Sequence, residues 1–208
     1  MDIQREERKI IVQAKKDPEA FGRLYDKYYP QIYGFILKRT GNVEVAQDLV
    51  SETFFAAVKN IWRYKITNRP FKAWLYKIAV AQIGQYYRNK KTVCEITLDE
   101  SPELIASKEY NSDSQAIENE EITEVKLLQK EVHELLLKLP DVQHTIIILR
   151  YFENRKVKDI ARILDLKENT VKSHLRRSLK KLHNFINKQE KFKQYGWREI
   201  LQYRRESV

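Results

Sequence analysis

Apolar side chains recur every three or four residues along most of this chain, and this spacing predicts helices rather than strands. In the first ninety residues it predicts one helix before the cap Asp17, a second that ends at Gly41, and a third that begins at the cap Asn42. A fourth predicted helix starts at Phe71 and ends in the basic run 88–91. Few glycines and prolines interrupt these repeats, so we expect an all-α fold.

The most informative repeat lies near the C-terminus. A short amphipathic segment over 156–164, a tight turn at 165–166 and a longer basic segment over 169–182 together predict a helix-turn-helix. The apolar stripes expected to be buried are Ile160, Ala161 and Leu164 on the first helix and Val171, Leu175, Leu179 and Leu182 on the second. The alternative is an ordinary amphipathic hairpin with a solvated, charged face.

The outer face of the second helix carries donors and cations suited to DNA. They are Asn169, Thr170, Lys172, Ser173, His174, Arg176 and Arg177. A helix with such a face fits the major groove, where its first turns reach base edges and its cations reach phosphates. The pattern therefore predicts a contact with duplex DNA.

Charge divides the chain into blocks. Residues 1–91 carry 18 basic and 9 acidic side chains (net +9), residues 92–125 carry 1 and 10 (net −9), and residues 126–208 carry 20 and 10 (net +10). We therefore expect two small helical domains, 1–91 and 126–187, joined by a flexible acidic linker, 92–125. An aromatic and basic extension, 188–208, follows. Two basic blocks indicate two surfaces for a polyanion.

A second candidate surface is the segment between the third and fourth predicted helices. It interleaves rings with cations and amides: Asn60, Trp62, Arg63, Tyr64, Lys65 and Arg69. Bases of single-stranded nucleic acid stack on such rings while cations follow the backbone. Lys72, Lys77 and Arg88 of the next helix are expected to face the same strand. The alternative is that a ring fills the domain core, an option that weighs more for Trp62 than for Tyr64.

Several classes of protein are disfavoured. The single cysteine, Cys94, permits no intrachain disulfide, and the four histidines lie at no metal-ligand spacing. No stretch approaches the roughly 20 apolar residues of a membrane span, and the N-terminus lacks a signal-peptide pattern. We see no phosphate loop and no nucleophile–base set. The expectation is a cytoplasmic, non-enzymatic protein without metal or cofactor.

Two sets of motifs resemble the bacterial sigma-70 superfamily, in its small extracytoplasmic-function group. The N-terminal set resembles region 2 and comprises Asp17 to Phe21, Leu24-Tyr25, Tyr28 to Pro30, Ala46 to Phe54 and Phe71 to Ala79. The C-terminal set resembles region 4 and comprises Leu139-Pro140, Ile146 to Tyr151, Asp159 to Ala161 and Thr170 to Ser173. Their order across a short acidic linker is more specific than either set alone.

The resemblance implies partners and roles. It implies that the helix with Asp48, Leu49, Glu52 and Phe54 docks on the β′ clamp helices of core RNA polymerase. It implies that the loop over 60–69 captures a flipped base of the melted minus-ten element. It further implies that the helix-turn-helix, with Lys156, Lys158 and Lys167 beside its reading helix, binds the minus-thirty-five element of promoter DNA. The apolar helix around 146–149 would help to hold the β flap, and an anti-sigma factor is a further partner that the resemblance allows.

Some positions depart from the family pattern. Asp165 stands where the inter-helix turn usually has glycine, and aspartate tolerates the left-handed backbone better than most residues. Lys156 and Lys167 replace the usual Ser or Thr caps, which removes cap hydrogen bonds and adds cations. Val80-Ala81 and Gln85 also differ, so we expect an atypical promoter preference. The alternative function is an autonomous helix-turn-helix regulator that acts without polymerase.

Overall fold

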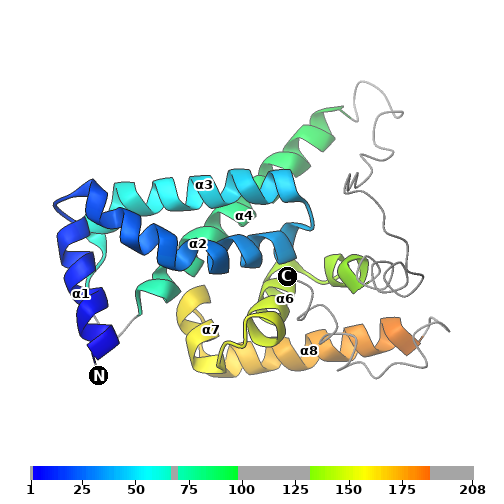
Figure 1. Cartoon of the computed structure of the whole chain (residues 1–208). Helices are drawn as coiled ribbons and strands as arrows, with labels where there is room; N and C mark the ends of the chain where they lie inside the picture. Colours follow the sequence, from blue (N-terminus) through cyan, green and yellow to red (C-terminus); the bar gives the residue numbers. More distant parts are fainter. Residues whose placement is uncertain (1, 67–69, 98–131, 188–208) are drawn as a thin grey trace, which may run out of the picture.

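The computed structural model describes residues 2–66, 70–97 and 132–187, and in these ranges it contains helices and no strand (Figure 1). The expected all-α fold is confirmed for this part of the chain. Most of the acidic linker and all of the extension 188–208 lie outside the described residues.

The N-terminal half is a packed group of four helices. They are α1 (Asp2–Ala14), α2 (Pro18–Thr40), α3 (Val43–Asn60) and α4 (Phe71–Thr97), with the single turn η1 (Ile61–Arg63) after α3. Helix α2 packs against α1, α3 and α4 (Figure 1). The core of this half includes Leu24, Ile32, Phe35, Val50 and Leu75, which are almost completely buried.

The predicted helix boundaries around α2 are confirmed. The carboxylate of Asp17 accepts a hydrogen bond from the backbone N–H of Glu19 at 2.9 Å. Gly41 closes the helix in the left-handed conformation, with φ 69° and ψ 9°, and Asn42 then caps α3 by accepting from the N–H of Val45 at 2.9 Å. These caps fix where α3 starts and hence which of its faces points outward.

Helix α4 is longer than the sequence pattern predicted. It continues through the basic run 88–91 to Thr97. Residues 92–97 contain neither glycine nor proline, so nothing in the local sequence stops the helix. The first residues assigned to the linker are therefore helical.

The C-terminal half contains the predicted helix-turn-helix. Residues 132–137 are helical, and then come α6 (Asp141–Ile147), the π-helical turn η2 (Ile148–Phe152), α7 (Val157–Leu164) and α8 (Glu168–Asn187). Asp165 caps α7 with φ 58° and ψ 42°, so it takes the left-handed conformation expected of it. Lys156 makes no cap hydrogen bond through its side chain.

The buried stripe of the motif differs slightly from the expected one. Ile160, Ala161 and Val171 are buried as expected, and Leu182 is too. Ile163 is buried in place of Leu164, which is half-exposed, and Leu175 and Leu179 are also only half-buried. Ser178 is fully buried between them, and its hydroxyl donates to the carbonyl of His174 at 2.7 Å.

The two halves lie against each other. Helix α4 packs on α7, and α2 packs on η2 (Figure 1). Phe35 of α2 and Tyr76 of α4 are both completely buried, with ring centroids 5.0 Å apart. Within the described ranges, no helix is long and apolar enough to cross a membrane.

Candidate functional site

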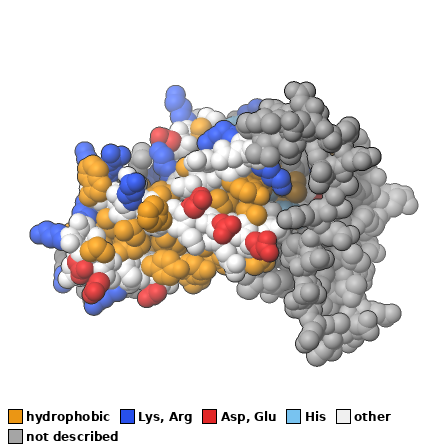
Figure 2. Space-filling view, turned by 90° about the horizontal axis from the view of Figure 1, so that it is seen from above, with side chains coloured by type: hydrophobic (Ala, Val, Ile, Leu, Met, Phe, Trp, Pro, Cys, Tyr) orange, Lys and Arg blue, Asp and Glu red, His pale blue; other side chains and the backbone are white. Residues whose placement is uncertain are grey.

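Helix α3 exposes a mixed acidic and apolar stripe. Asp48, Glu52, Phe55 and Val58 recur at three- or four-residue spacing, and Trp62 of η1 extends the stripe by one turn. The side chains of Phe55 and Trp62 are 72% and 62% exposed. Figure 2 views this side of the molecule and shows carboxylates lying among apolar side chains. Large exposed apolar groups beside acids are typical of a surface that binds another protein.

Two residues expected on this surface face the interior instead. Leu49 and Phe54 are each only 3% exposed, so in the described conformation they support the helix from inside, and their contact with polymerase stays a prediction. Phe54 lies against the rings of Tyr25 and Tyr29, at centroid distances of 4.7 and 6.3 Å. The spacing of the apolar residues Ala46, Val50 and Ala57 along the sequence indicates that Phe54 lies on the buried face of α3 and Phe55 on the exposed face.

The rings after α3 have exchanged the expected roles. Trp62 is exposed, donates its indole N–H to the carbonyl of Lys59 at 3.1 Å, and carries the guanidinium of Arg63 4.6 Å from its ring centroid. Tyr64 is only 6% exposed and packs on Phe71 and Trp74 at 5.2 and 5.3 Å. The sequence analysis gave the core alternative more weight for Trp62 than for Tyr64, and the structure shows the reverse order: Tyr64 fills the core.

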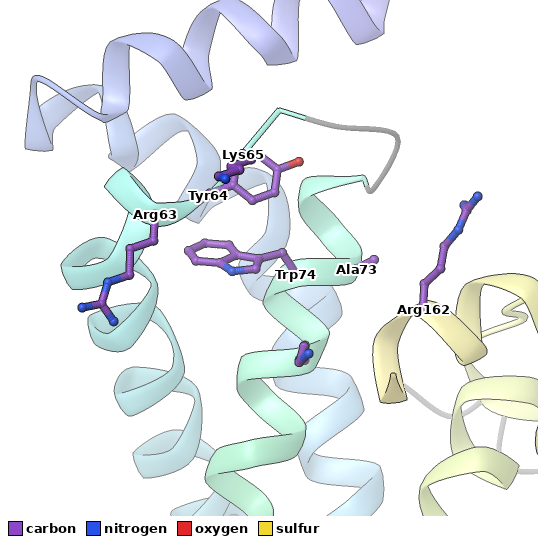
Figure 3. Close-up of a pocket in the computed structure, with 7 residues that line it drawn as sticks. Arg63, Tyr64, Lys65, Ala73, Trp74 and Arg162 are labelled. Atoms are coloured by element: carbon purple, nitrogen blue, oxygen red, sulfur yellow. The ribbon is translucent and has the colours of Figure 1, made fainter. Parts of the chain in front are cut away.

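A cavity of about 300 Å³ opens beside these rings (Figure 3). Its lining is aromatic and cationic and consists of Arg63, Tyr64, Lys65, Ala73, Trp74, Lys77 and Arg162. Trp74 lies beside Tyr64 in the first half, whereas Arg162 approaches from α7 in the second half (Figure 3). A volume of this size accommodates a nucleotide, and the described lining contains no carboxylate to repel its phosphate.

The other residues predicted to contact single-stranded DNA differ in how exposed they are and in which groups they pair with. Asn60 donates to the carbonyl of Ala56 at 2.8 Å, so its amide is used at the end of α3. Lys65 and Arg88 are exposed. Lys77 is also exposed and pairs with Asp165 of the helix-turn-helix at 3.2 Å. Arg69 lies outside the described residues.

Lys72 is the unusual cation of this group. Burial, and then the nearby Arg155 guanidinium, lower the pKa of its ammonium to about 8 in all, against the opposing pull of Glu153 and Glu7. A half-buried lysine with this environment is a weaker phosphate partner than an exposed one in the described conformation.

The outer face of α8 is available for DNA. Asn169, Lys172, Ser173, Arg176 and Arg177 are exposed, and so are Lys156, Lys158 and Lys167 around α7. Thr170 and His174 are half-buried. Burial, and then the charge of Arg177, lowers the pKa of His174 below its usual value, so this side chain is neutral at pH 7. The positive charge on the outer face of α8 therefore comes from its arginine and lysine side chains, and His174 adds none.

A polar cluster at the end of α2 was not predictable from the sequence pattern. The guanidinium of Arg39 is almost completely buried and reaches α6, where it donates to Asp141 Oδ1 at 2.8 Å and to Thr145 Oγ1 at 3.3 Å. A third nitrogen lies 2.8 Å from His144 Nδ1. The ring of Tyr87, from α4, covers the guanidinium at 5.2 Å. We call this group the Arg39 cluster.

A second polar cluster, the Glu153 cluster, joins the halves beside η2. Glu153 accepts hydrogen bonds from Lys38 of α2 at 3.2 Å and from the hydroxyl of Tyr76 of α4 at 2.7 Å. Arg155 donates to the same hydroxyl at 3.1 Å. Burial, and then the charge of Glu153, raises the pKa of Tyr76, which keeps its phenol protonated as a donor.

The local backbone explains how Glu153 and Arg155 reach α2 and α4. The N–H of Glu153 bonds the carbonyl of Ile148, and the N–H of Arg155 bonds that of Leu149. Asn154 between them is left-handed, with φ 52°. The wide turn of η2 followed by this reversal ends the helix and turns both charged side chains toward the other half.

The apolar helix expected to hold a partner is completely buried. Ile146, Ile147, Ile148 and Leu149 have no exposed surface, so in the described conformation these side chains close the C-terminal half, and a contact of this helix with the β flap stays a prediction. In the parts of the chain that the structure describes, no group of three or more His, Cys, Asp and Glu side chains is arranged to hold a metal ion.

Comparison with known proteins gives a consistent result. Residues 24–93 match the family described as Sigma-70 region 2, and residues 129–182 match Sigma-70, region 4. The chain is 33% identical over 175 residues to the ECF RNA polymerase sigma factor SigW of Bacillus subtilis, an alignment that covers 82% of this chain and 91% of SigW.

Solved structures share the fold at lower identity. CnrH in complex with the cytosolic domain of CnrY matches with a TM-score of 0.63 and 20% identity, over 88% of this chain and 98% of that one. The sigma factor RpoE in complex with the anti-sigma factor NepR, from Bartonella quintana, matches with a TM-score of 0.58 and 20% identity, over 80% and 96%. Both similarities concern the fold.

Proposed function

Since this chain belongs to the extracytoplasmic-function group of the sigma-70 family and is an alternative sigma factor that directs transcription initiation, we propose specific surfaces for its polymerase and promoter contacts. The N-terminal half, proposed as 1–91, binds polymerase and the minus-ten element. The C-terminal half, proposed as 126–187, binds the minus-thirty-five element. Because it works with bacterial RNA polymerase, we place it in the cytoplasm.

The polymerase contact is assigned to the residues of the stripe that lie on α3 itself, without Trp62. Asp48 and Glu52 supply charge, and Phe55 and Val58 supply apolar area that is otherwise left in water. We assign the β′ clamp helices of polymerase as its occupant, which requires basic groups opposite the two carboxylates. This stripe is the observation that carries the proposal, because an autonomous DNA-binding regulator has no use for it.

The minus-ten contact is assigned to Trp62 and the neighbouring cavity. An exposed indole with Arg63 against it provides a stacking platform, and Lys65 and Lys77 lie where a strand backbone would pass. Extruding a base costs a few kcal/mol, which stacking and cavity contacts offset. Tyr64 supports Trp74 in the cavity wall and is a positioning residue.

The minus-thirty-five contact is assigned to the first turns of α8. Asn169, Lys172 and Arg176 lie on its exposed face and reach base edges and phosphates. Lys156, Lys158 and Lys167 add phosphate contacts from the flanks of α7. In this role the protein binds and positions nucleic acid and polymerase and needs no chemistry of its own.

The experiment that tests the assignment reconstitutes the protein with bacterial core RNA polymerase and maps the 5′ ends of transcripts made from genomic DNA fragments. We expect a set of start sites that is absent without the protein, preceded by common minus-ten and minus-thirty-five sequences. Transcripts unchanged by the protein, together with tight duplex binding by the protein alone, would support the autonomous regulator instead.

A single substitution tests the minus-ten assignment. Trp62→Ala is expected to reduce permanganate reactivity of thymines in the melted promoter while the protein still co-elutes with polymerase, because the exposed ring contributes little to the core. Phe55→Ala is the matched control: it removes an exposed ring from the same surface and is expected to weaken polymerase binding first.

A further inference from the structure

The outer face of α1 carries a shallow hollow that none of the contacts proposed above uses. Its volume is about 370 Å³, and its lining consists of Arg8, Lys9, Val12 and Gln13. Arg8 and Val12 are four residues apart, and so are Lys9 and Gln13, so the two pairs form adjacent rows on one side of the helix. All four side chains are exposed. Glu6 is also exposed on α1 but does not line the hollow.

The lining suits a nucleotide. Its two cations match phosphate, the amide of Gln13 both donates and accepts hydrogen bonds, and the methyl groups of Val12 offer apolar contact to a base or a sugar. No carboxylate lines the hollow within the described residues. The carboxylate of Glu7 is turned toward α2 instead, where Tyr28 and Lys27 donate to it at 2.7 and 3.0 Å. The hollow therefore keeps a positive charge.

Contacts of α1 place this hollow beside the minus-ten loop. Lys15, just after the helix, donates from its ammonium to the backbone carbonyl of Tyr64 at 2.6 Å. Arg8 also lies near Tyr64, because burial and then Glu7 raise the pKa of this phenol while the charge of Arg8 opposes the rise. Seven residues separate Arg8 from Lys15, which is about 10 Å at the helical rise. The loop therefore runs alongside α1, the blue ribbon at the top of Figure 3.

The cavity assigned to the promoter base and the hollow on α1 form one cationic surface. Lys65 lines the cavity, directly follows Tyr64 in the loop and is exposed. Arg8 and Lys9 continue the positive charge from the loop onto the helix. The length of about 10 Å along α1 corresponds to roughly three stacked nucleotides at 3.4 Å each. A single strand bound at the cavity is therefore long enough to reach the hollow within a few nucleotides.

The order of the promoter elements indicates which nucleotides reach α1. Arg162 lines the cavity from the half assigned to the minus-thirty-five element, which lies upstream of the minus-ten element. Helix α1 belongs to the other half and flanks the loop through Lys15. A strand that comes from upstream and places a base in the cavity therefore continues past α1 in the direction of the transcription start.

We propose that the hollow on α1 binds the single-stranded promoter DNA immediately downstream of the minus-ten element, with Arg8 and Lys9 on its phosphates and Val12 against a base. This site extends the minus-ten surface and rests on the proposed function. The contact is mainly electrostatic, so it depends little on base sequence. Because it is made to the melted strand and not to paired DNA, it stabilises the open promoter relative to the closed one.

The test uses the full-length protein bound to core RNA polymerase and two single-stranded probes from a promoter that the transcript mapping identifies. The short probe of the non-template strand ends with the minus-ten element, and the long probe continues to the transcription start. The variant Arg8→Gln/Lys9→Gln removes both charges of the hollow and keeps good helix formers at exposed positions. The matched control, Lys180→Gln/Lys181→Gln, removes two adjacent exposed charges from α8, in the half assigned to DNA that both probes lack. Circular dichroism verifies that each protein is folded.

We expect the parent and the control to bind the long probe about five- to tenfold more tightly than the short probe. The Arg8→Gln/Lys9→Gln variant should bind the two probes within about twofold of each other, while its affinity for the short probe stays that of the parent. On the long probe, the slope of log affinity against log salt should fall in this variant by about 0.7 for each lost phosphate contact.

Three results would overturn the α1 site. They are equal sensitivity of all three proteins to probe length, a parent that binds both probes equally, and loss of co-elution with polymerase in the Arg8→Gln/Lys9→Gln variant, which would assign the hollow to a contact with polymerase. In the first two cases the affinity for the short probe remains, so the proposed function survives. A parent that forms no complex with polymerase, or that binds neither probe in the complex, would refute the proposed function and with it the promoter strand as the occupant of the hollow.

Discussion

Aromatic side chains close together in this sequence differ sharply in how much of their surface is exposed. Phe54 is buried against tyrosine rings and Phe55 is 72% exposed. Trp62 is exposed and Tyr64, two residues later, is buried. At the residue scale the functional surface thus consists of those aromatic side chains that the core does not use.

The contrast between Trp62 and Tyr64 gives a stability prediction. Tyr64→Ala removes a buried ring packed on Phe71 and Trp74 and should lower the free energy of unfolding by about 3–5 kcal/mol. Trp62→Ala should change it by less than about 1 kcal/mol. Urea denaturation followed by circular dichroism measures both. Equal losses would contradict the assignment of Tyr64 to the core and Trp62 to the surface.

Lys72 predicts a pH dependence. Its pKa is about 8 in the folded protein against 10.5 for an ordinary lysine, so between these values the unfolded chain binds the extra proton and stability rises with pH. Below pH 8 both states are protonated and the cost of burying the charge is fully present. Lys72→Met should therefore be more stable than the parent at pH 7, on the order of 1 kcal/mol after discounting for exposure, and the gap should shrink by pH 9.5. A constant gap in denaturant midpoints would contradict this.

The elements most visible in the sequence are those with strong local signals. The caps Asp17 and Asn42 and the left-handed Gly41 place α2 and α3, and Asp165 keeps the helix-turn-helix turn without glycine. The same signals, with the phase of the apolar repeat, predict which face of α8 carries its arginines.

Helix α8 gives a prediction at this scale. Replacing Lys172 or Arg176 with alanine should reduce the slope of log affinity against log salt by about 0.9 for each lost phosphate contact, measured with polymerase-bound protein and promoter DNA. Lys181→Ala, an exposed change four turns along the helix from its start, serves as the control and should leave the slope nearly unchanged. Parallel slopes for all three variants would place the DNA on a different face.

Features that depend on contacts between distant segments could not be predicted from the local sequence pattern. The π-helical turn η2 and the left-handed Asn154 turn Glu153 and Arg155 toward α2 and α4, yet the surrounding residues form an ordinary apolar run. Burial of Arg39 depends on Asp141, His144 and Thr145, more than one hundred residues away. Neither periodicity nor composition encodes which of the 39 basic side chains becomes a structural one.

At the scale of the whole molecule, our proposal assigns one protein-binding surface and two DNA-binding surfaces to the protein. Phe55 and Val58 of the α3 stripe are exposed, whereas the cavity beside Trp74 lies where the first half meets Arg162 of α7. In this proposal, polymerase and promoter DNA contact different faces of the molecule.

The most direct test of the account is co-elution with bacterial core RNA polymerase in gel filtration, comparing the parent protein with an Asp48→Lys/Glu52→Lys variant. Both carboxylates are exposed, so the variant should fold normally. Asp26→Lys is the control, a charge reversal at an exposed position of α2, outside the proposed stripe. We predict co-elution of the parent and the control and loss of co-elution of the double variant. Co-elution of all three would contradict the α3 assignment, and co-elution of none would contradict the role as a sigma factor.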